Sequence, residues 1–228
     1  MPSSTSQPPE VARLVSVNVG GPREVEWRGE TVLTSIWKSP VSGIVQLGKL
    51  NLAGDKQSDL SVHGGIDKSV YAYPSEHYAW WCGELPGVEL PWGVFGENFS
   101  TEGLLEDEVF IGDRFRIGTA EVVVTQPRLP CFKLGIRFGE PMMVKRFLQS
   151  GRSGFYLKVA REGEVEAGCG IERLAKASRS ISIAAIGRLH GDQAADAEQL
   201  RQVSELPDLA RSWKAHFRKR LEIRGQLT

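Results

Sequence analysis

The stretch that decides the fold is residues 108–131, which read EVFIGDRFRIGTAEVVVTQPRLPC. It contains three short apolar segments separated by glycine turns, at 108–111, 114–117 and 121–124. Short β-branched segments that alternate with glycine turns predict a meander of strands. Pro127 and Pro130 then interrupt the ladder, because proline has no N–H to donate. The segment therefore predicts a mainly β domain in which Cys131 lies on a stiff turn just past a strand end.

Segments typical of strands continue on both sides of this meander. Upstream we expect strands at 11–19, 24–27 and 30–37 and a β pair within 41–52, with a hairpin turn at Arg28-Gly29. Downstream, 154–160 and 163–167 predict a later hairpin. Helices are expected at 74–81 and 140–148. Many short strands joined by glycine turns favour a barrel or a sandwich.

The composition changes after Ser178, where three helical segments follow one another, 181–190, 194–203 and 207–221. In the last of them, apolar residues recur every four positions and form one stripe, Leu209, Trp213, Phe217 and Leu221. We therefore expect a disordered lead-in at 1–10, a β-rich domain at 11–177 and a three-helix unit at 178–228.

Composition limits the function classes. The chain has 28 basic and 28 acidic residues and a formal net charge of zero, which argues against broad binding of nucleic acid or of an anionic membrane. Its apolar stretches are too short for a membrane span. The first ten residues lack the pattern of a signal peptide. Three widely spaced cysteines do not form a disulfide framework, so we expect a cytoplasmic protein.

Cys131 is the first candidate functional residue. It lies between Arg128 and Lys133, and cations near a thiol favour the thiolate, which is the form that binds a metal or attacks an electrophile. Most cysteines in proteins are simply buried, and we interpret Cys82 and Cys169 in that way. The basic setting, held by two prolines, distinguishes Cys131 from them.

Two further polar segments come before Cys131. The first spans 54–69, and its glycines and charged side chains could form a cradle for an anion: Lys56, His63, Gly64, Gly65, Asp67 and Lys68. The second spans 93–99 and holds Glu97 and Asn98 in a loop bounded by glycines. Each segment alone is typical of an ordinary turn.

Together these segments resemble one family in their order and spacing. The chain resembles MOSC-domain proteins, a domain named from molybdenum cofactor sulfurases, and within them the bacterial YiiM-like subgroup. The resemblance covers nearly the whole chain and rests on residues 36–41, 54–57, 62–68, 73–78, 95–100, 126–134 and 211–214. It implies a mainly β fold with α-helices, namely a barrel-like MOSC domain followed by a small three-helix bundle.

The resemblance also implies a function. Family members bind a molybdenum cofactor of the molybdopterin type and are linked to the reduction of N-hydroxylated compounds such as hydroxylaminopurines and amidoximes. Cys131 matches the cysteine that ligates molybdenum, and a thiolate suits such a soft, sulfur-rich centre. Pyridoxal phosphate is not expected.

Other residues receive candidate roles around this cofactor. Its phosphate would be held by cations and by backbone amides, from Lys38, Lys56, Lys68, Arg128, Gly64 and Gly65. His63 could bind the cofactor or deliver a proton, Asp67 could orient His63 or bind the pterin, and Glu97 with Asn98 could line the substrate side. Reductive N–O cleavage consumes two protons, and His63, Asp67 or Glu97 could supply them.

Alternatives remain open at this point. The chain has no cysteine pair at cluster spacing and no dinucleotide fingerprint, so electrons would come from a separate flavin or iron–sulfur reductase. The domain could instead carry the cofactor or a sulfur atom without turnover. A third reading is a metal-independent cysteine hydrolase that uses Cys131, His63 and Asp67. The three-helix unit could close the barrel, form a homodimer contact or dock the reductase.

Overall fold

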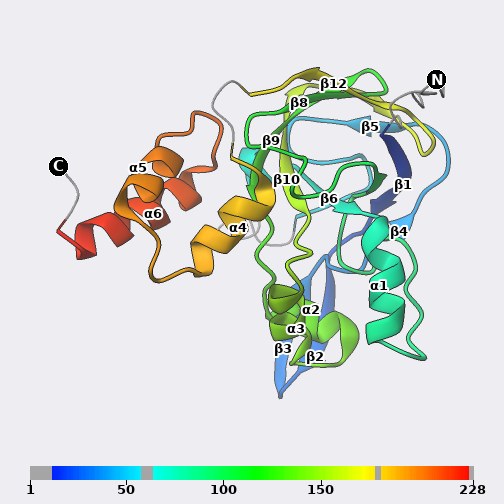
Figure 1. The fold of residues 1–228 in the computed structure, drawn as a ribbon. Coiled ribbons are helices and arrows are strands. Elements are labelled where there is room, and N and C mark those ends of the chain that lie inside the picture. Colours follow the sequence, from blue (N-terminus) through cyan, green and yellow to red (C-terminus); the bar gives the residue numbers. More distant parts are fainter. Residues whose placement is uncertain (1–11, 58–63, 178–180, 226–228) are drawn as a thin grey trace, which may run out of the picture.

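The computed structural model describes residues 12–57, 64–177 and 181–225 (Figure 1); the predicted lead-in at 1–10 lies outside these ranges. The strands are β1 (Arg13–Val19), β2 (Arg23–Trp27), β3 (Glu30–Thr34), β4 (Ser39–Pro40), β5 (Val45–Leu47), β6 (Val70–Pro74), β7 (Phe99–Glu102), β8 (Arg114–Ile117), β9 (Ala120–Pro127), β10 (Phe155–Arg161), β11 (Gly163–Val165) and β12 (Ile171–Ala175). The helices are α1 (Glu76–Glu84), α2 (Phe132–Phe138), α3 (Met143–Ser150), α4 (Ile183–Gly191), α5 (Ala197–Ser204) and α6 (Arg211–Ile223), with a 3-10 turn η1 (Ile66–Lys68).

One eight-stranded sheet dominates the fold, in the order β12-β8-β9-β10-β6-β7-β1-β4. Its neighbours are antiparallel except for β6 and β7, which run parallel. Two of the three segments of the predicted meander form the paired strands β8 and β9, which come second and third in this order. Two small sheets, β5 with β11 and β2 with β3, lie beside it. The strands curve around a common interior (Figure 1).

The sheet comes back toward its own beginning. Backbone hydrogen bonds join the start of β1 to the segment that leads into β12: Leu14 N to Cys169 O at 2.9 Å, Gly168 N to Leu14 O at 2.7 Å, and Ile171 N to Ala12 O at 2.7 Å. The other half of the same edge of β1 pairs with β4. These contacts give the domain the barrel-like form that was predicted, in a fold that is mainly β with α-helices.

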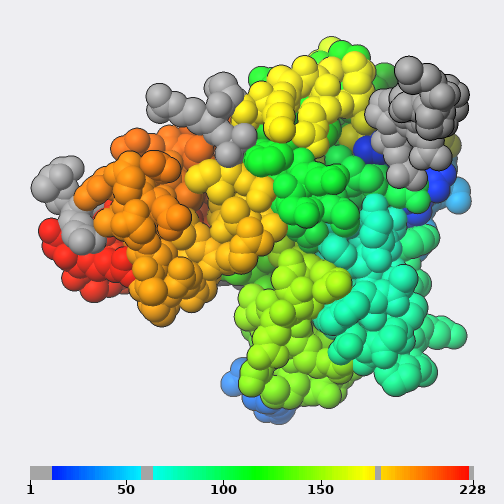
Figure 2. Space-filling view, viewed as in Figure 1, coloured from blue at the N-terminus to red at the C-terminus, as the bar shows by residue number. Residues whose placement is uncertain are grey.

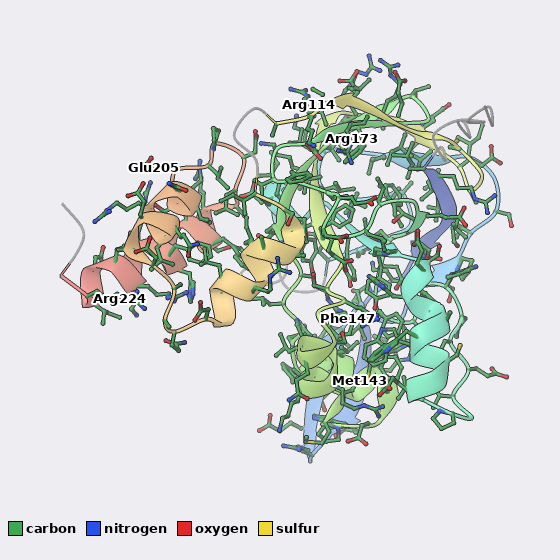
Figure 3. The ribbon with its side chains drawn as sticks, viewed as in Figure 1. Arg114, Met143, Phe147, Arg173, Glu205 and Arg224 are labelled. Atoms are coloured by element: carbon green, nitrogen blue, oxygen red, sulfur yellow. The ribbon has the colours of Figure 1, made fainter. Side chains whose placement is uncertain are left out.

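The buried side chains form two clusters. The larger fills the interior of the curved sheet, with Val17, Phe115 and Val124 among its members. The smaller is aromatic and binds the helices α1 and α3 together through Trp81, Phe95 and Phe147. Phe147 and Met143 are labelled in Figure 3, where they lie between the ribbons of α3 and α1. The helices α1–α3 and the β2–β3 hairpin thus form a lobe at one end of the barrel.

The three C-terminal helices pack beside the barrel rather than under this lobe (Figure 2). As predicted, the stripe on α6 is buried, and Trp213, Phe217 and Leu221 belong to the same apolar cluster as the barrel interior. Ala210 N donates to Thr125 O of β9 at 3.2 Å, and Lys158 of β10 pairs with Asp208 at 2.6 Å. The apolar interior therefore continues from the sheet into the helical unit.

Several local predictions were wrong. Pro127 is the last residue of β9, where it faces Phe155, so the ladder runs up to it rather than stopping before it. Residues 108–111 contribute an isolated bridge from Phe110 to Ser182 instead of a strand. β11 pairs with β5, a strand far away in the sequence, and makes no hairpin with β10. The helix α2, which begins directly after Cys131, was not expected.

Within the described ranges, no helix combines the length and the apolar character that a bilayer span requires.

Candidate functional site

A cleft opens between the barrel strands β6 and β10, the segment after β3, and the loop that precedes α2. It contains about 690 Å³ of space free of protein atoms, counting its open mouth, which is within the usual range for small-molecule sites. Its walls are formed by Thr34, Ser35, Ile36, Lys38, Asp55, Lys56, Gln57, Lys68, Tyr71, Gly96, Asn98, Arg128, Leu129, Cys131, Lys133 and Tyr156.

Cys131 lies in the cleft wall as the residue immediately before α2. It is partly buried and forms no disulfide. Lys68 and Arg128 both interact electrostatically with its sulfur. Because nearby cations favour the thiolate, the position suits a metal ligand or a nucleophile. The structure therefore supports the predicted basic setting, although the cysteine precedes a helix rather than a simple turn.

Arg128 is a buried cation in the same wall, with an exposed fraction of 6%. Its guanidinium carbon lies 4.7 Å from the ring centroid of Tyr71 and 5.0 Å from that of Phe147. Burial lowers its pKa, but Tyr71, Tyr156 and Cys131 raise it further than burial lowers it. No carboxylate within the described ranges forms an ion pair with it. A positive charge is thus held inside the protein facing the cleft.

Lys38 and Asp55 form a buried ion pair at the cleft wall, with Nζ 2.5 Å from Oδ1. Asp55 also accepts hydrogen bonds from Gly20 N and from Asn98 Nδ2, both at 2.9 Å. Burial lowers the pKa of Lys38, and Asp55 opposes that shift. Asn98 Oδ1 accepts from Tyr71 N at 3.1 Å. Lys38 and Asn98 therefore reach the cleft, but much of their hydrogen-bonding capacity is used in holding its wall.

Gln57, the last described residue before the gap at 58–63, bonds to the backbone of residues that follow it. Its Oε1 accepts from Gly65 N at 3.1 Å, and its Nε2 donates to Lys68 O at 3.0 Å. Thr125 Oγ1 donates to Asp67 O at 2.7 Å, which fixes η1 against β9. Lys68 faces the ring of Tyr156 with its Nζ 6.0 Å from the centroid. Burial lowers the pKa of Lys68, although Asp67 and Cys131 oppose this.

The predicted catalytic role of Glu97 does not fit its position. Glu97 is completely buried and is not among the wall residues, although its neighbours Gly96 and Asn98 are. Its carboxylate accepts hydrogen bonds from Tyr78 Oη, from Gly93 N at 2.8 Å, from Phe95 N at 3.1 Å and from Ser100 Oγ at 3.1 Å. Burial raises its pKa, and these bonds oppose the rise. Glu97 organises the 93–97 loop behind the cleft.

The cleft brings together most of the predicted residues, namely Lys38, Lys56, Lys68, Asn98, Arg128 and Cys131. Gly64, Gly65 and Asp67 lie next to Lys68 in the chain but are not wall residues, and His63 lies outside the described residues. Tyr71, Tyr156 and Ser35 were missed. A tyrosine within a buried strand needs a partner for its hydroxyl, and that need was the available signal for Tyr71 and Tyr156.

The wall chemistry fits a phosphate-bearing molybdenum cofactor. Ser35 Oγ is buried at the cleft and has no hydrogen-bond partner in the described part of the chain, so a polar ligand would satisfy it. Lys56 and Lys133 add positive charge on the wall, and Cys131 offers a soft sulfur donor. Across the described residues, no group of three or more His, Cys, Asp and Glu side chains gathers in a geometry suited to a metal ion.

Two relatives and two solved structures cover most of the chain. It is 39% identical over 207 residues to the uncharacterized protein YflK of Bacillus subtilis, covering 91% of this chain and 93% of that protein. It is 35% identical to protein YiiM of Escherichia coli, covering 82% and 84%. The structure of YiiM from Geobacillus stearothermophilus has a TM-score of 0.78 at 36% identity, covering 92% and 99%. That of Escherichia coli YiiM has a TM-score of 0.74 at 27% identity, covering 95% of each chain.

A more distant relative is a Gibberella moniliformis protein named "Reductase", 29% identical over 206 residues, which are 89% of this chain and 36% of that longer protein. Two family models match consecutive parts of the chain. The MOSC domain matches residues 59–172, and the YiiM-like, 3-alpha helix domain matches residues 181–224. With the relatives above, these matches show that the chain belongs to the MOSC-domain family, in its YiiM-like branch.

Proposed function

We propose that this protein is a molybdenum-dependent reductase of N-hydroxylated compounds of the hydroxylaminopurine or amidoxime class, with Cys131 as the metal ligand. The main observation behind this proposal is that Cys131 lies in the same cleft as Lys68 and the buried cation Arg128. Membership of the MOSC family supports a molybdenum cofactor, and the name of the fungal relative supports a reductive reaction.

Different residues of the cleft wall would contact different parts of the cofactor. Cys131 would hold the metal, while Arg128, Lys56 and Lys68 would offset the negative charge of the cofactor and its phosphate. The cofactor supplies, when bound, the two-electron chemistry of the reaction. Ser35 Oγ would donate to or accept from a polar group of the bound molecule. Tyr71 and Phe147 keep the guanidinium of Arg128 in place by stacking on it.

The reaction converts R–NHOH, two electrons and two protons into R–NH₂ and water, so a proton donor must face the substrate. Lys68 suits this role, because its ammonium lies in the cleft wall and burial lowers its pKa, which makes it a better proton donor than an exposed lysine. Glu97 is too deeply enclosed to act in this way. His63 stays a predicted proton donor. The electrons would come from a separate flavin or iron–sulfur reductase.

The test is to express the protein in a host that makes molybdopterin and to measure bound molybdenum, bound pterin and amidoxime reduction by a reduced viologen dye. We expect Cys131→Ala to lose molybdenum and activity. The prediction that Cys82 is buried was wrong, because it lies on the exposed side of α1, outside the cleft wall. Cys82→Ala is therefore the matched control, and it should behave as wild type. Equal metal and equal activity in all three proteins would refute the ligand assignment. Bound cofactor without turnover would favour the carrier role.

A further inference from the structure

A pair of arginines lies beside the cleft and takes no part in the site described above. Arg23 of β2 places its guanidinium carbon 4.4 Å from the ring centroid of Trp37, and Arg137 of α2 places its own at 5.8 Å from the same ring. Trp37 is the residue between the wall residues Ile36 and Lys38. Lys133, one turn before Arg137 on α2, is also a wall residue. The pair therefore lies at the rim of the cleft.

These positive charges are not balanced by neighbouring carboxylates. Within the described ranges, Arg23, Lys133 and Arg137 form no ion pair. Burial lowers the pKa of Arg137, Arg23 lowers it further, and Glu97 and Tyr78 oppose these effects. The carboxylate of Glu97 is already engaged by Tyr78 and by the backbone of the 93–97 loop. The two guanidinium groups therefore repel each other with little compensation.

Arg137 also carries an unsatisfied donor. Its Nε is buried and finds no acceptor among the residues that the structure describes. A buried N–H without a partner costs about 1–3 kcal/mol, and two like charges held close together add to that cost. An anion bound between the two arginines would accept from the unsatisfied N–H and offset the repulsion at the same time. A planar guanidinium can present two parallel N–H groups to such an oxyanion.

We infer that Arg23, Arg137 and Lys133 form a binding site for a phosphate group at the rim of the cleft, against the indole of Trp37. The phosphate could belong to the substrate, which would then be the nucleotide form of an N-hydroxylated base, or to the cofactor. These two sources rest on the proposed function, whereas the phosphate site itself does not. The molecule that occupies the cleft would therefore carry its anionic end at this rim.

The first experiment titrates inorganic phosphate and pyrophosphate into the full chain and follows the heat of binding. We expect the double variant Arg23→Gln/Arg137→Gln to bind at least about tenfold more weakly than wild type, because it loses two charge-assisted contacts. Arg28→Gln is the matched control, since Arg28 lies at the tip of the same hairpin against Trp27, and it should leave binding unchanged. Equal binding by wild type and the double variant would overturn the site.

The second experiment separates the sources, using a hydroxylaminopurine riboside and its 5′-monophosphate as substrates. If the phosphate is the substrate's, the double variant raises KM for the monophosphate alone and keeps its pterin content. If it is the cofactor's, pterin and molybdenum contents fall and both substrates lose activity equally. A double variant equal to wild type in all these measurements would overturn the inference. Failure of the Cys131 assignment would leave the phosphate titration unaffected, so the two ideas fail separately.

Discussion

Lys38 and Asp55 form a buried ion pair that joins the segment after β3 to the loop before residue 58, with side-chain exposures of 9% and 3%. Asp55 connects this pair to the backbone of Gly20 and to the amide of Asn98. Three segments that are distant in the sequence therefore meet at one carboxylate in the cleft wall. This network holds the wall in place before any ligand binds.

Removing one partner of this pair should destabilise the protein strongly. We expect Lys38→Met to lower the free energy of unfolding by about 3 kcal/mol, because it leaves a buried carboxylate without its cation. Urea unfolding at pH 7 measures the change. Lys158→Met is the control, since the pair of Lys158 with Asp208 is about one-third exposed and should contribute at most about 1 kcal/mol. Equal losses in the two variants would contradict a structural role for Lys38.

Replacing the carboxylate of Glu97 should damage the fold rather than the chemistry alone. All four groups that contact it are hydrogen-bond donors, and the amide of Gln would set N–H against N–H. We expect Glu97→Gln to lower the free energy of unfolding by about 2–3 kcal/mol. Glu102→Gln on β7, whose partner Arg13 is exposed, should cost less than about 1 kcal/mol. Normal stability with lost turnover would restore Glu97 as a catalytic group.

The local parts of the fold were predictable because their signals are short-range. The hairpin turn at Arg28-Gly29 has φ values of 55° and 82°, which fits the left-handed turn that such a pair favours. The four-residue spacing of Trp213, Phe217 and Leu221 indicated the buried face of α6. In both cases the residues that define the feature are neighbours in the sequence.

Long-range partners were beyond the reach of local patterns. The short strand β11 reads as half of a hairpin, yet it pairs with β5, and β6 pairs in parallel with β7 across the whole of α1. The helix α2 was hidden by Pro130 on one side and by Gly135 and Gly139 on the other. Tertiary packing of Leu134 into the aromatic cluster holds this helix in place.

The sequence indicated many of the residues that line the cleft, but not which way each side chain faces. The family resemblance grouped Lys68, Arg128 and Cys131, and the structure places all three in the wall of one cleft. It could not show that Glu97 turns inward while its neighbour Asn98 reaches the cleft, because the donors that hold Glu97 come from Tyr78 on α1 and from the backbone of the turn at 93–96. The sequence also gave no sign that Arg23, far from α2, would share an indole with Arg137.

Arg128 should be more important for the cofactor than for the fold. A buried cation without a carboxylate partner costs desolvation energy, and an apolar replacement avoids that cost. We expect Arg128→Met, made in a host without molybdopterin, to have a free energy of unfolding within about 1 kcal/mol of that of wild type. In a host that makes molybdopterin, its molybdenum content should fall. Arg152→Met is the control, since Arg152 stacks on Trp80 outside the cleft wall, and it should keep normal metal content.

The stacked pair of His190 and His216, between α4 and α6, should make the helical unit sensitive to acid. Their ring centroids lie 4.3 Å apart, and burial, His216 and Arg220 lower the pKa of His190 from 6.5 to about 4. Between these two pH values the unfolded chain binds the proton that the folded protein excludes. The free energy of unfolding should therefore fall as the pH drops from 6.5 toward 4.

The full shift corresponds to about 3 kcal/mol, which solvent screening of this half-buried ring reduces to about 1–2 kcal/mol. Urea unfolding of wild type and of His190→Gln at pH 7, 5.5 and 4.5 measures it. The variant should lose less stability than wild type across this range, because Gln does not titrate. Parallel curves for the two proteins would show that His190 binds its proton equally well in the folded and unfolded states, against the packing seen around Trp213 and His216.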